Sequence, residues 1–577
     1  MAARSGDAAS RGACSLGIAV LTAALGLGAV ATPASAQFER SKLRVTKDLA
    51  VEVLHGYPRS RHNHYSPVTI GLSIRNRGPE RTLEIEVDGD TRHTRTLRLS
   101  AEDKQRTFLY LPSSIGDAQR LDLRLTDGLS GKRKSFIAVS HTQTKEPIAR
   151  LGHVSAAFNV AHPFGMVGDV GGHIPDSWRG LVGLRAIAVE QARYDGLSAA
   201  DRKVLLEWTA AGGLLLIVQP DEVSAAAVAL SAPLLGSPQS VPDGQQQRLG
   251  HGAVVHLPAG NLAEVDTSFW TDIGTCESCG WTVPVEATWG EPFGYLLDER
   301  IGNPGGKPTF GLFIVLLLFA LAVGPVGWRF LVVGKRRPLY YVSFVMVSAL
   351  VFSGGVLVAD VFAQGLTPKG VAHSLRVIDQ VNDLEIGTEE LAIYAPTARG
   401  TRLDMAAAHM PVLPRQMGDG ERGALHVDSG DGRQSIEGAI DVRFRRLVGA
   451  RWIGKSEGRL VVSTEGGIPS VENHLGADLR SLVVWHEGRA HGIEGSLGQG
   501  QRATLEPLSE DDAGQPHLPT GFLIAQSSEL VQALASGELG GQRYYGLLER
   551  DPGDSRLIDA RMNETTPGVH LVAGIYR

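Results

Sequence analysis

The sequence predicts a multi-domain α+β membrane protein, and three observations support this. Two apolar segments, Phe310–Val333 and Tyr340–Ala363, are each long enough to cross a bilayer as a helix. Residues 37–147 and 364–577 contain short runs in which apolar and polar residues alternate, which is typical of β-strands. Residues 148–263 instead combine compact apolar runs with a helical pattern, which indicates an α/β segment.

A short basic turn separates the two apolar segments and contains Lys335, Arg336 and Arg337. The turn is too short to form a domain, so we predict a two-helix transmembrane hairpin over residues 309–363. Short loops rich in lysine and arginine stay in the cytoplasm, which leaves both flanking regions on the other side. Neither segment has an ionisable residue near its centre, so the hairpin is interpreted as an anchor rather than a transport path.

The first 36 residues have the parts of a secretory signal peptide. Arg4 and Arg11 precede an apolar run over residues 16–30, and Ala34-Ser35-Ala36 follows as a small-residue cleavage site. Export agrees with the orientation of the hairpin. The predicted location is the cytoplasmic membrane, with both large soluble regions extracytoplasmic (periplasmic).

Residues 37–147 are expected to form an N-terminal β-sandwich. Apolar residues alternate over 68–74 and 83–87, with turns between the runs, and this spacing favours an immunoglobulin-like (Ig-like) module without its disulfide. Residues 364–577 are expected to form a C-terminal mainly-β domain, with candidate strands at 390–394, 459–464 and 481–486.

The α/β segment, residues 148–263, has a strand–helix–strand pattern. An apolar run over 185–189 precedes Ser198, which is expected to cap a helix with Asp201 three residues later. A second run follows at 214–218. This order predicts a parallel crossover.

Pro175–Trp178, Leu197–Trp208 and Gly212–Leu215 resemble a class I glutamine amidotransferase-like domain, whose fold is flavodoxin-like. Such domains occur in exported bacterial membrane proteins of unassigned function, which also carry a hairpin similar to Gly324–Pro338. The resemblance extends to a β module over Val471–Leu479 and covers about half of the chain. It implies a flavodoxin-like α/β domain over the segment described above.

This α/β domain is predicted to be catalytically inactive. Amidotransferases of this fold use a cysteine nucleophile, and residues 148–263 contain no cysteine. If the domain were an enzyme, the residues to test would be His173, Asp176 and Glu190.

Cys276 and Cys279 lie in an irregular connector, residues 264–308. They could form a disulfide, half of a metal site or a redox pair, and in an oxidising compartment the disulfide is favoured. No further ligands accompany them at zinc spacing, so neither a metal nor a cofactor is predicted. The net charge of −6 argues against a nucleic-acid-binding surface.

Together these observations predict a membrane-anchored extracytoplasmic binding or scaffold protein of the bacterial cell envelope, with other envelope or membrane proteins as partners. Two alternatives stay open. One is an exported hydrolase or amidase that uses the α/β domain. The other is a protein that binds cell-wall polymer or carbohydrate through a sandwich.

Overall fold

The structure is a computed structural model of the 577 residues. The chain divides into two compact units, Met1–Ser35 and Ala36–Arg577, and every described residue belongs to the second. The described residues are 39–55, 59–60, 67–89, 91–111, 118–143, 148–152, 166–169, 174–219, 239–241, 244–250, 252–258, 309–333, 338–364, 369–394, 402–406, 408–412, 425–430, 433–438, 445–465, 468–493, 495–509, 542–549, 563–564 and 570–576.

Several predictions fall outside these ranges and stay predictions. They concern the signal peptide over residues 1–36, the paired cysteines Cys276 and Cys279, and the basic turn that contains Lys335, Arg336 and Arg337.

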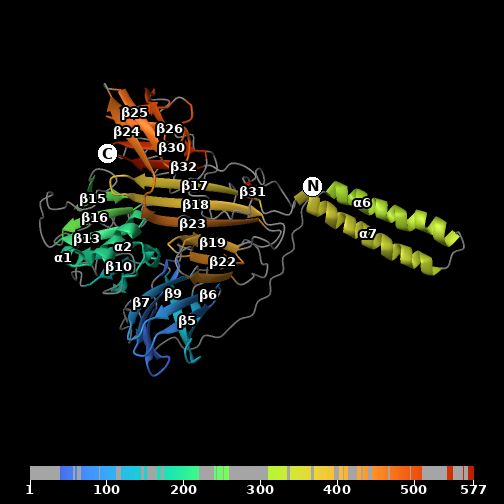
Figure 1. The fold of residues 1–577 in the computed structure, drawn as a ribbon, viewed down its shortest axis with the longest axis horizontal. Helices are drawn as coiled ribbons and strands as arrows, with labels where there is room; N and C mark the ends of the chain where they lie inside the picture. Colours follow the sequence, from blue (N-terminus) through green and yellow to red (C-terminus); the bar gives the residue numbers. More distant parts are fainter. Residues whose placement is uncertain are drawn as a thin grey trace, which may run out of the picture. The chain divides into compact units, whose positions relative to one another are not determined.

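The described chain is mostly β, so the predicted α+β fold class is wrong. Its strands form five sheets (Figure 1). The α-helices of the described residues are α1 (Gln191–Asp195), α2 (Ala199–Ala210), α6 (Thr309–Leu321) and α7 (Pro338–Gln364).

Two of the sheets enclose one core in the N-terminal region. Leu49, Ile70 and Leu109 of a four-stranded sheet and Ile85 and Leu123 of an eight-stranded sheet are at most 1% exposed and belong to one apolar cluster. Side chains alternate between the two faces of a strand, so each sheet also has an outer face. In sheet order, the four-stranded sheet contains β1 (Glu39–Arg44), β2 (Leu49–His55), β4 (Val68–Asn76) and β7 (Lys104–Leu111). The eight-stranded sheet contains β19 (Arg402–Ala406), β22 (Arg433–Glu437), β21 (Leu425–Gly430), β6 (Thr91–Leu99), β5 (Arg81–Asp88), β8 (Ala118–Asp127), β9 (Arg133–Gln143) and β3 (Arg59–Ser60).

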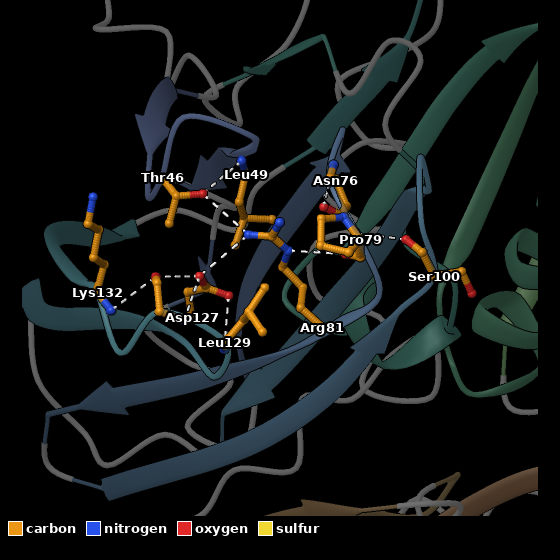
Figure 2. A network of polar contacts seen from close by, with 11 residues as sticks. Thr46, Leu49, Asn76, Pro79, Arg81, Ser100, Asp127, Leu129 and Lys132 are labelled. Carbon is orange, nitrogen blue, oxygen red and sulfur yellow. Dashed lines mark hydrogen bonds and ion pairs between the residues drawn. The ribbon is translucent and has the colours of Figure 1, made fainter.

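A buried ion pair lies at one end of this core (Figure 2). Arg81 Nη1 is 3.4 Å from Asp127 Oδ2, and the two side chains are 4% and 0% exposed. Arg81 also donates to Thr46 Oγ1 at 3.4 Å, while the Asp127 carboxylate accepts from the backbone N–H groups of Leu129 and Ser130. The pair therefore joins β5, the end of β8 and the turn after β1.

The eight-stranded sheet contains strands that precede the apolar helices in the sequence and strands that follow them. β21 pairs in parallel with β6, which places residues 425–429 beside residues 91–95. Two sheets around one core are present in residues 37–147, but the second sheet extends beyond this range, because β21, β22 and β19 from the C-terminal region join it. The alternation of apolar and polar residues along a strand shows which face of the strand is buried. It does not show which strand pairs with it when that strand lies hundreds of residues away in the sequence.

His93 lies at this junction and is 2% exposed. Its Nε2 is 2.8 Å from Ser429 Oγ, and its Nδ1 has no hydrogen-bond partner among the described residues. Burial, with smaller contributions from the neighbouring Arg95, His426 and Arg179, lowers the pKa of His93 to about 3.

The junction is therefore expected to lose stability in acid. The folded-state pKa lies below the usual value of 6.5, so the stabilising contribution is complete above that value and is lost as the pH falls towards 3. The free energy of unfolding should fall by up to about 1.4 kcal/mol per pH unit from this group. Chemical denaturation of the wild type and of His93→Gln between pH 7 and pH 4.5 measures this change in the free energy of unfolding. Equal pH dependence in both proteins would contradict this assignment.

The third sheet has seven strands, of which the first five in sheet order are parallel. The predicted strand–helix–strand pattern is present: Ser198 Oγ accepts from the backbone N–H of Asp201 at 3.1 Å, which starts α2. In sheet order the strands are β11 (Met166–Asp169), β10 (Ile148–Leu151), β12 (Ala186–Glu190), β13 (Leu214–Gln219), β16 (Gly252–Pro258), β15 (Gly244–Leu249) and β14 (Gln239–Val241), and the 3-10 turn η2 spans Trp178–Leu181.

A flavodoxin-like α/β domain is nevertheless not evident, and that prediction is wrong. A doubly wound domain has helices on both faces of its sheet, whereas the described part of this region has only α2 and the one-turn α1. Leu205 and Trp208 of α2 belong to the same apolar cluster as Ile386 and Leu571, which lie in a sheet from the C-terminal region. The strand–helix–strand crossover was predicted correctly, but the layer that packs against it also contains strands from the C-terminal region.

That sheet has ten strands, and its centre holds a second buried ion pair. Arg376 contacts both carboxylate oxygens of Glu385, at 3.0 and 2.8 Å, and Trp452 Nε1 donates to the same carboxylate at 3.1 Å. In sheet order the strands are β20 (Met410–Val412), β23 (Arg445–Lys455), β18 (Leu384–Tyr394), β17 (Lys369–Asp379), β32 (His570–Ile575), β30 (Arg543–Leu548), β26 (Leu479–His486), β27 (Arg489–Gly492) and β29 (Glu506–Pro507), with β31 (Asn563–Glu564) beside β17. A three-stranded sheet contains β24 (Arg459–Glu465), β25 (Ile468–His474) and β28 (Arg502–Thr504).

The predicted two-helix transmembrane hairpin is also wrong. α6 has 13 residues, fewer than the approximately 20 that a span needs. The π-helical segments η6 (Ala322–Val326) and η7 (Trp328–Val333) follow it. Pro325 lies within η6, and because proline has no N–H group it interrupts the α-helical ladder. Among the described residues one helix, α7, is long and apolar enough to cross a membrane. Hydropathy alone did not reveal this interruption.

Candidate functional site

The outer face of the four-stranded sheet is the candidate site. The register places its outward-facing side chains in three transverse rows across β1, β2, β4 and β7. The rows are Arg40, Leu54, Gly71 and Phe108, then Lys42, Glu52, Ser73 and Arg106, then Arg44, Ala50, Arg75 and Lys104.

Small or short side chains occupy much of the middle of these rows. Gly71 has no side chain, and a Cβ atom there would lie 3.0 Å from the Phe108 ring. Leu54 and Phe108 are buried, whereas Arg40 and Arg106 at the outer strands are exposed. In the first two rows the face is therefore low along its centre, whereas exposed Arg75 occupies the middle of the third row. We call this feature the basic groove. It contains an open cavity of about 270 Å³, which is lined by Arg40, Glu52, Leu54, Gly71, Leu72, Ser73, Lys104, Gln105 and Arg106.

The charge of the groove is strongly unbalanced. Cations occupy six positions of the three rows, whereas Glu52 provides the single carboxylate. The six cations are Arg40, Lys42, Arg44, Arg75, Lys104 and Arg106.

The outer face of the eight-stranded sheet provides an internal comparison. There Glu86 accepts ion pairs from Arg92 at 2.8 Å, from Arg124 at 3.3 Å and from Arg133 at 2.9 Å. Arg124 also pairs with Asp122 at 2.8 Å, and its pKa is raised, chiefly by that hydrogen bond. On this face carboxylates therefore recur beside the arginines, whereas the three rows of the groove hold six cations and one carboxylate.

A stack of cations and aromatic rings closes one end of the groove. Arg106 lies 4.9 Å from the centroid of Phe108, which is stacked on Tyr110 at 6.4 Å. Arg179 of η2 lies 4.5 Å from the centroid of Tyr110, and the Tyr110 hydroxyl donates to the Asp176 carboxylate. Burial lowers the pKa of Arg179, while Tyr110 and Asp176 raise it. The stack fixes the positions of Arg106 and Phe108 in the groove.

The structure does not assemble the residues proposed for catalysis. His173 lies outside the described residues. Asp176 is exposed and holds Tyr110, while Glu190 is at the end of β12, directly before α1. No hydrogen bond joins Asp176 to Glu190 in the described part of the chain, and no group of histidine, cysteine and carboxylate residues suited to a metal occurs there.

Sequence reasoning missed the groove, although one signal was present. Arg40, Lys42 and Arg44 alternate with other residues, as do Lys104 and Arg106. A cation at every second position of a predicted strand places them all on one face. The sequence pattern does not reveal the strand order, which places the cations of β1 and those of β7 on the same sheet.

No family model matches the chain, and no curated protein matches it. Some solved structures resemble parts of it. A cycloisomaltooligosaccharide glucanotransferase of Paenibacillus sp. has 12% identity and a TM-score of 0.14, covering 23% of this chain and 19% of that one. β-Glucuronidase 2 of Bacteroides uniformis has 12% identity and a TM-score of 0.12, covering 33% and 24%. The yeast delta-COP-I mu-homology domain has 8% identity and a TM-score of 0.16, covering 36% and 95%. The chain thus spans about a fifth and a quarter of the first two. Similarities this low support neither a fold nor an activity.

Proposed function

We propose that this protein is a membrane-anchored, extracytoplasmic binding protein of the bacterial cell envelope, without catalytic activity, and that the basic groove is its binding surface. The observation that carries the proposal is the charge imbalance of the groove, since its three rows contain six cations and one carboxylate. Three of these cations, Arg40, Lys104 and Arg106, line the cavity together with Glu52. Fields of one sign in a cleft attract ligands of the opposite sign.

The helix α7 supports the anchoring. Within its segment Leu339–Val356, 6% is buried, unlike the core helix of a soluble protein. Met346 and Leu350 are 64% and 74% exposed. A contiguous exposed apolar surface is rare on soluble proteins and marks a site of contact with a membrane or a partner. The pairing of β6 with β21 requires both soluble regions to lie on one side of the membrane, because hydrogen-bonded strands share a compartment. We therefore propose that α7 attaches the protein to the membrane without placing the regions before and after it on opposite sides.

Arginine within the apolar helix is expected to release the protein from the membrane. We expect the full chain to stay in the membrane fraction after alkaline washing, and the Met346→Arg, Leu350→Arg variant to appear in the wash. Each arginine at the centre of a span costs about 2.5–3.5 kcal/mol of insertion. The matched control is Met346→Ala, Leu350→Ala, which keeps the segment apolar and should stay bound.

Protease added outside intact cells, after the outer layers are made permeable, should cleave the soluble regions. A wild-type chain that washes off the membrane, or one that is protected from external protease, would contradict the proposal.

A further inference from the structure

We infer that the basic groove binds an anionic polysaccharide, a glycan chain whose carboxylate or phosphate groups recur along its length. This inference rests on the proposed function and names the ligand class of the same site. The cations of β1 are two residues apart, so they recur every 6.7 Å or so along one side. β7 lies three strands away, about 14 Å across the sheet, and carries the cations of the other side. An extended polyanion lying along the strands would contact both sides.

The arginine residues provide the geometry that such groups require. A guanidinium binds a carboxylate or a phosphate through two parallel N–H donors. Arg40 and Arg106 both line the cavity from opposite sides and are exposed. Anionic groups on one chain can therefore reach an arginine on either side of the groove.

The middle of the groove suits hydroxyl groups. Glu52 and Ser73 are half-buried neighbours in the central row, and both line the cavity. A carboxylate accepts hydrogen bonds from hydroxyls, and a serine hydroxyl both donates and accepts. A glycan bears hydroxyls between its charged groups, so it matches the central row, in which Lys42 and Arg106 at the two sides flank Glu52 and Ser73.

Other polyanions match the groove less well. The described residues between 39 and 111 contain no exposed large apolar side chain, so the groove lacks the apolar anchors of protein interfaces and of membrane-inserting surfaces. Phe108 is 2% exposed beneath Arg106 and offers no platform on which nucleic-acid bases could stack. The burial of Phe108 also disfavours a neutral glycan, which would bind against an exposed aromatic face. Charged groups of the ligand must therefore provide the recognition.

The test measures binding of the detergent-solubilised full chain to defined polymers. Polygalacturonate supplies carboxylates and poly(glycerol phosphate) supplies phosphates, so the two distinguish the anionic group. We expect a Kd for at least one of them that is ten or more times lower than for methyl-esterified polygalacturonate or polyglutamate, and binding that weakens as salt increases.

The variant Lys42→Glu, Lys104→Glu reverses one exposed charge on each side of the groove. It should weaken binding at least tenfold, because two attractions become two repulsions. The matched control, Arg98→Glu, Lys132→Glu, makes the same change in net charge on exposed positions of β6 and of the turn before β9, and should bind within twofold of the wild type. Equal thermal midpoints for both variants show that each is folded.

Two results would overturn the inference, and they differ in what they leave standing. Tighter binding to polyglutamate or to oligothymidylate, lost in the Lys42→Glu, Lys104→Glu variant, overturns the ligand class but keeps the groove as the binding surface. If binding to isolated cell envelopes and to every polymer is unchanged in that variant, the groove is not a binding surface and the proposed function fails as well.

Discussion

Replacing Glu385 by alanine is expected to lower the free energy of unfolding by about 3–5 kcal/mol. The Arg376 and Glu385 side chains are 6% and 3% exposed, and the substitution leaves the guanidinium buried without its counter-ion. Trp452 Nε1 also loses an acceptor. The loss is large because a buried charge that loses its partner keeps its full desolvation cost. Chemical denaturation of the solubilised chain measures it.

The double variant Arg376→Met, Glu385→Met is the control for this argument. It removes both charges together, so the desolvation cost disappears with the attraction. We expect it to be more stable than Glu385→Ala, although more atoms have changed. If the double variant is as unstable as the single one, the destabilisation comes from lost packing and not from an unpaired charge.

Replacing Asp127 by alanine is expected to have an effect of similar size, about 3–5 kcal/mol. The carboxylate is fully buried, balances Arg81 and accepts hydrogen bonds from the backbone of Leu129 and Ser130. Its removal leaves a buried cation and two backbone donors without this acceptor (Figure 2).

The same strand offers a matched control. Asp122 also pairs with an arginine, but its side chain is 38% exposed, and a pair in contact with water contributes less than about 1 kcal/mol. Asp122→Ala should therefore be nearly as stable as the wild type. Equal losses in Asp122→Ala and Asp127→Ala would show that burial does not set the strength of these pairs.

Local sequence signals predicted local structure. Ser198 and Asp201 indicated where α2 begins, and the alternation over residues 83–87 identified β5 and its buried face. The candidate strands at 459–464 and 481–486 correspond to β24 and β26. In each case the signal and the structure involve residues close together in the chain.

The larger arrangement could not be predicted, because it depends on contacts between distant residues. The groove needs β1 and β7 at opposite edges of one sheet, while β5 and β6, which lie between them in the chain, belong to another sheet. The cations of β1 were visible, but their partners across the groove were not. The α/β segment failed in the same way, since Ile386 and Leu571 complete its core from far along the chain.

The parallel pairing of β6 with β21 also determines the order of events during synthesis. Thr94 and Asp428, which share a hydrogen bond across this pair, are 334 residues apart. A ribosome that adds 5–20 residues per second needs about 20–60 s to cover that distance. During this interval β6 has no neighbour on one side, and an open strand edge is a template for aggregation. The helix α7 emerges before β21 does, so its apolar surface is exposed at a time when the sheet is still open.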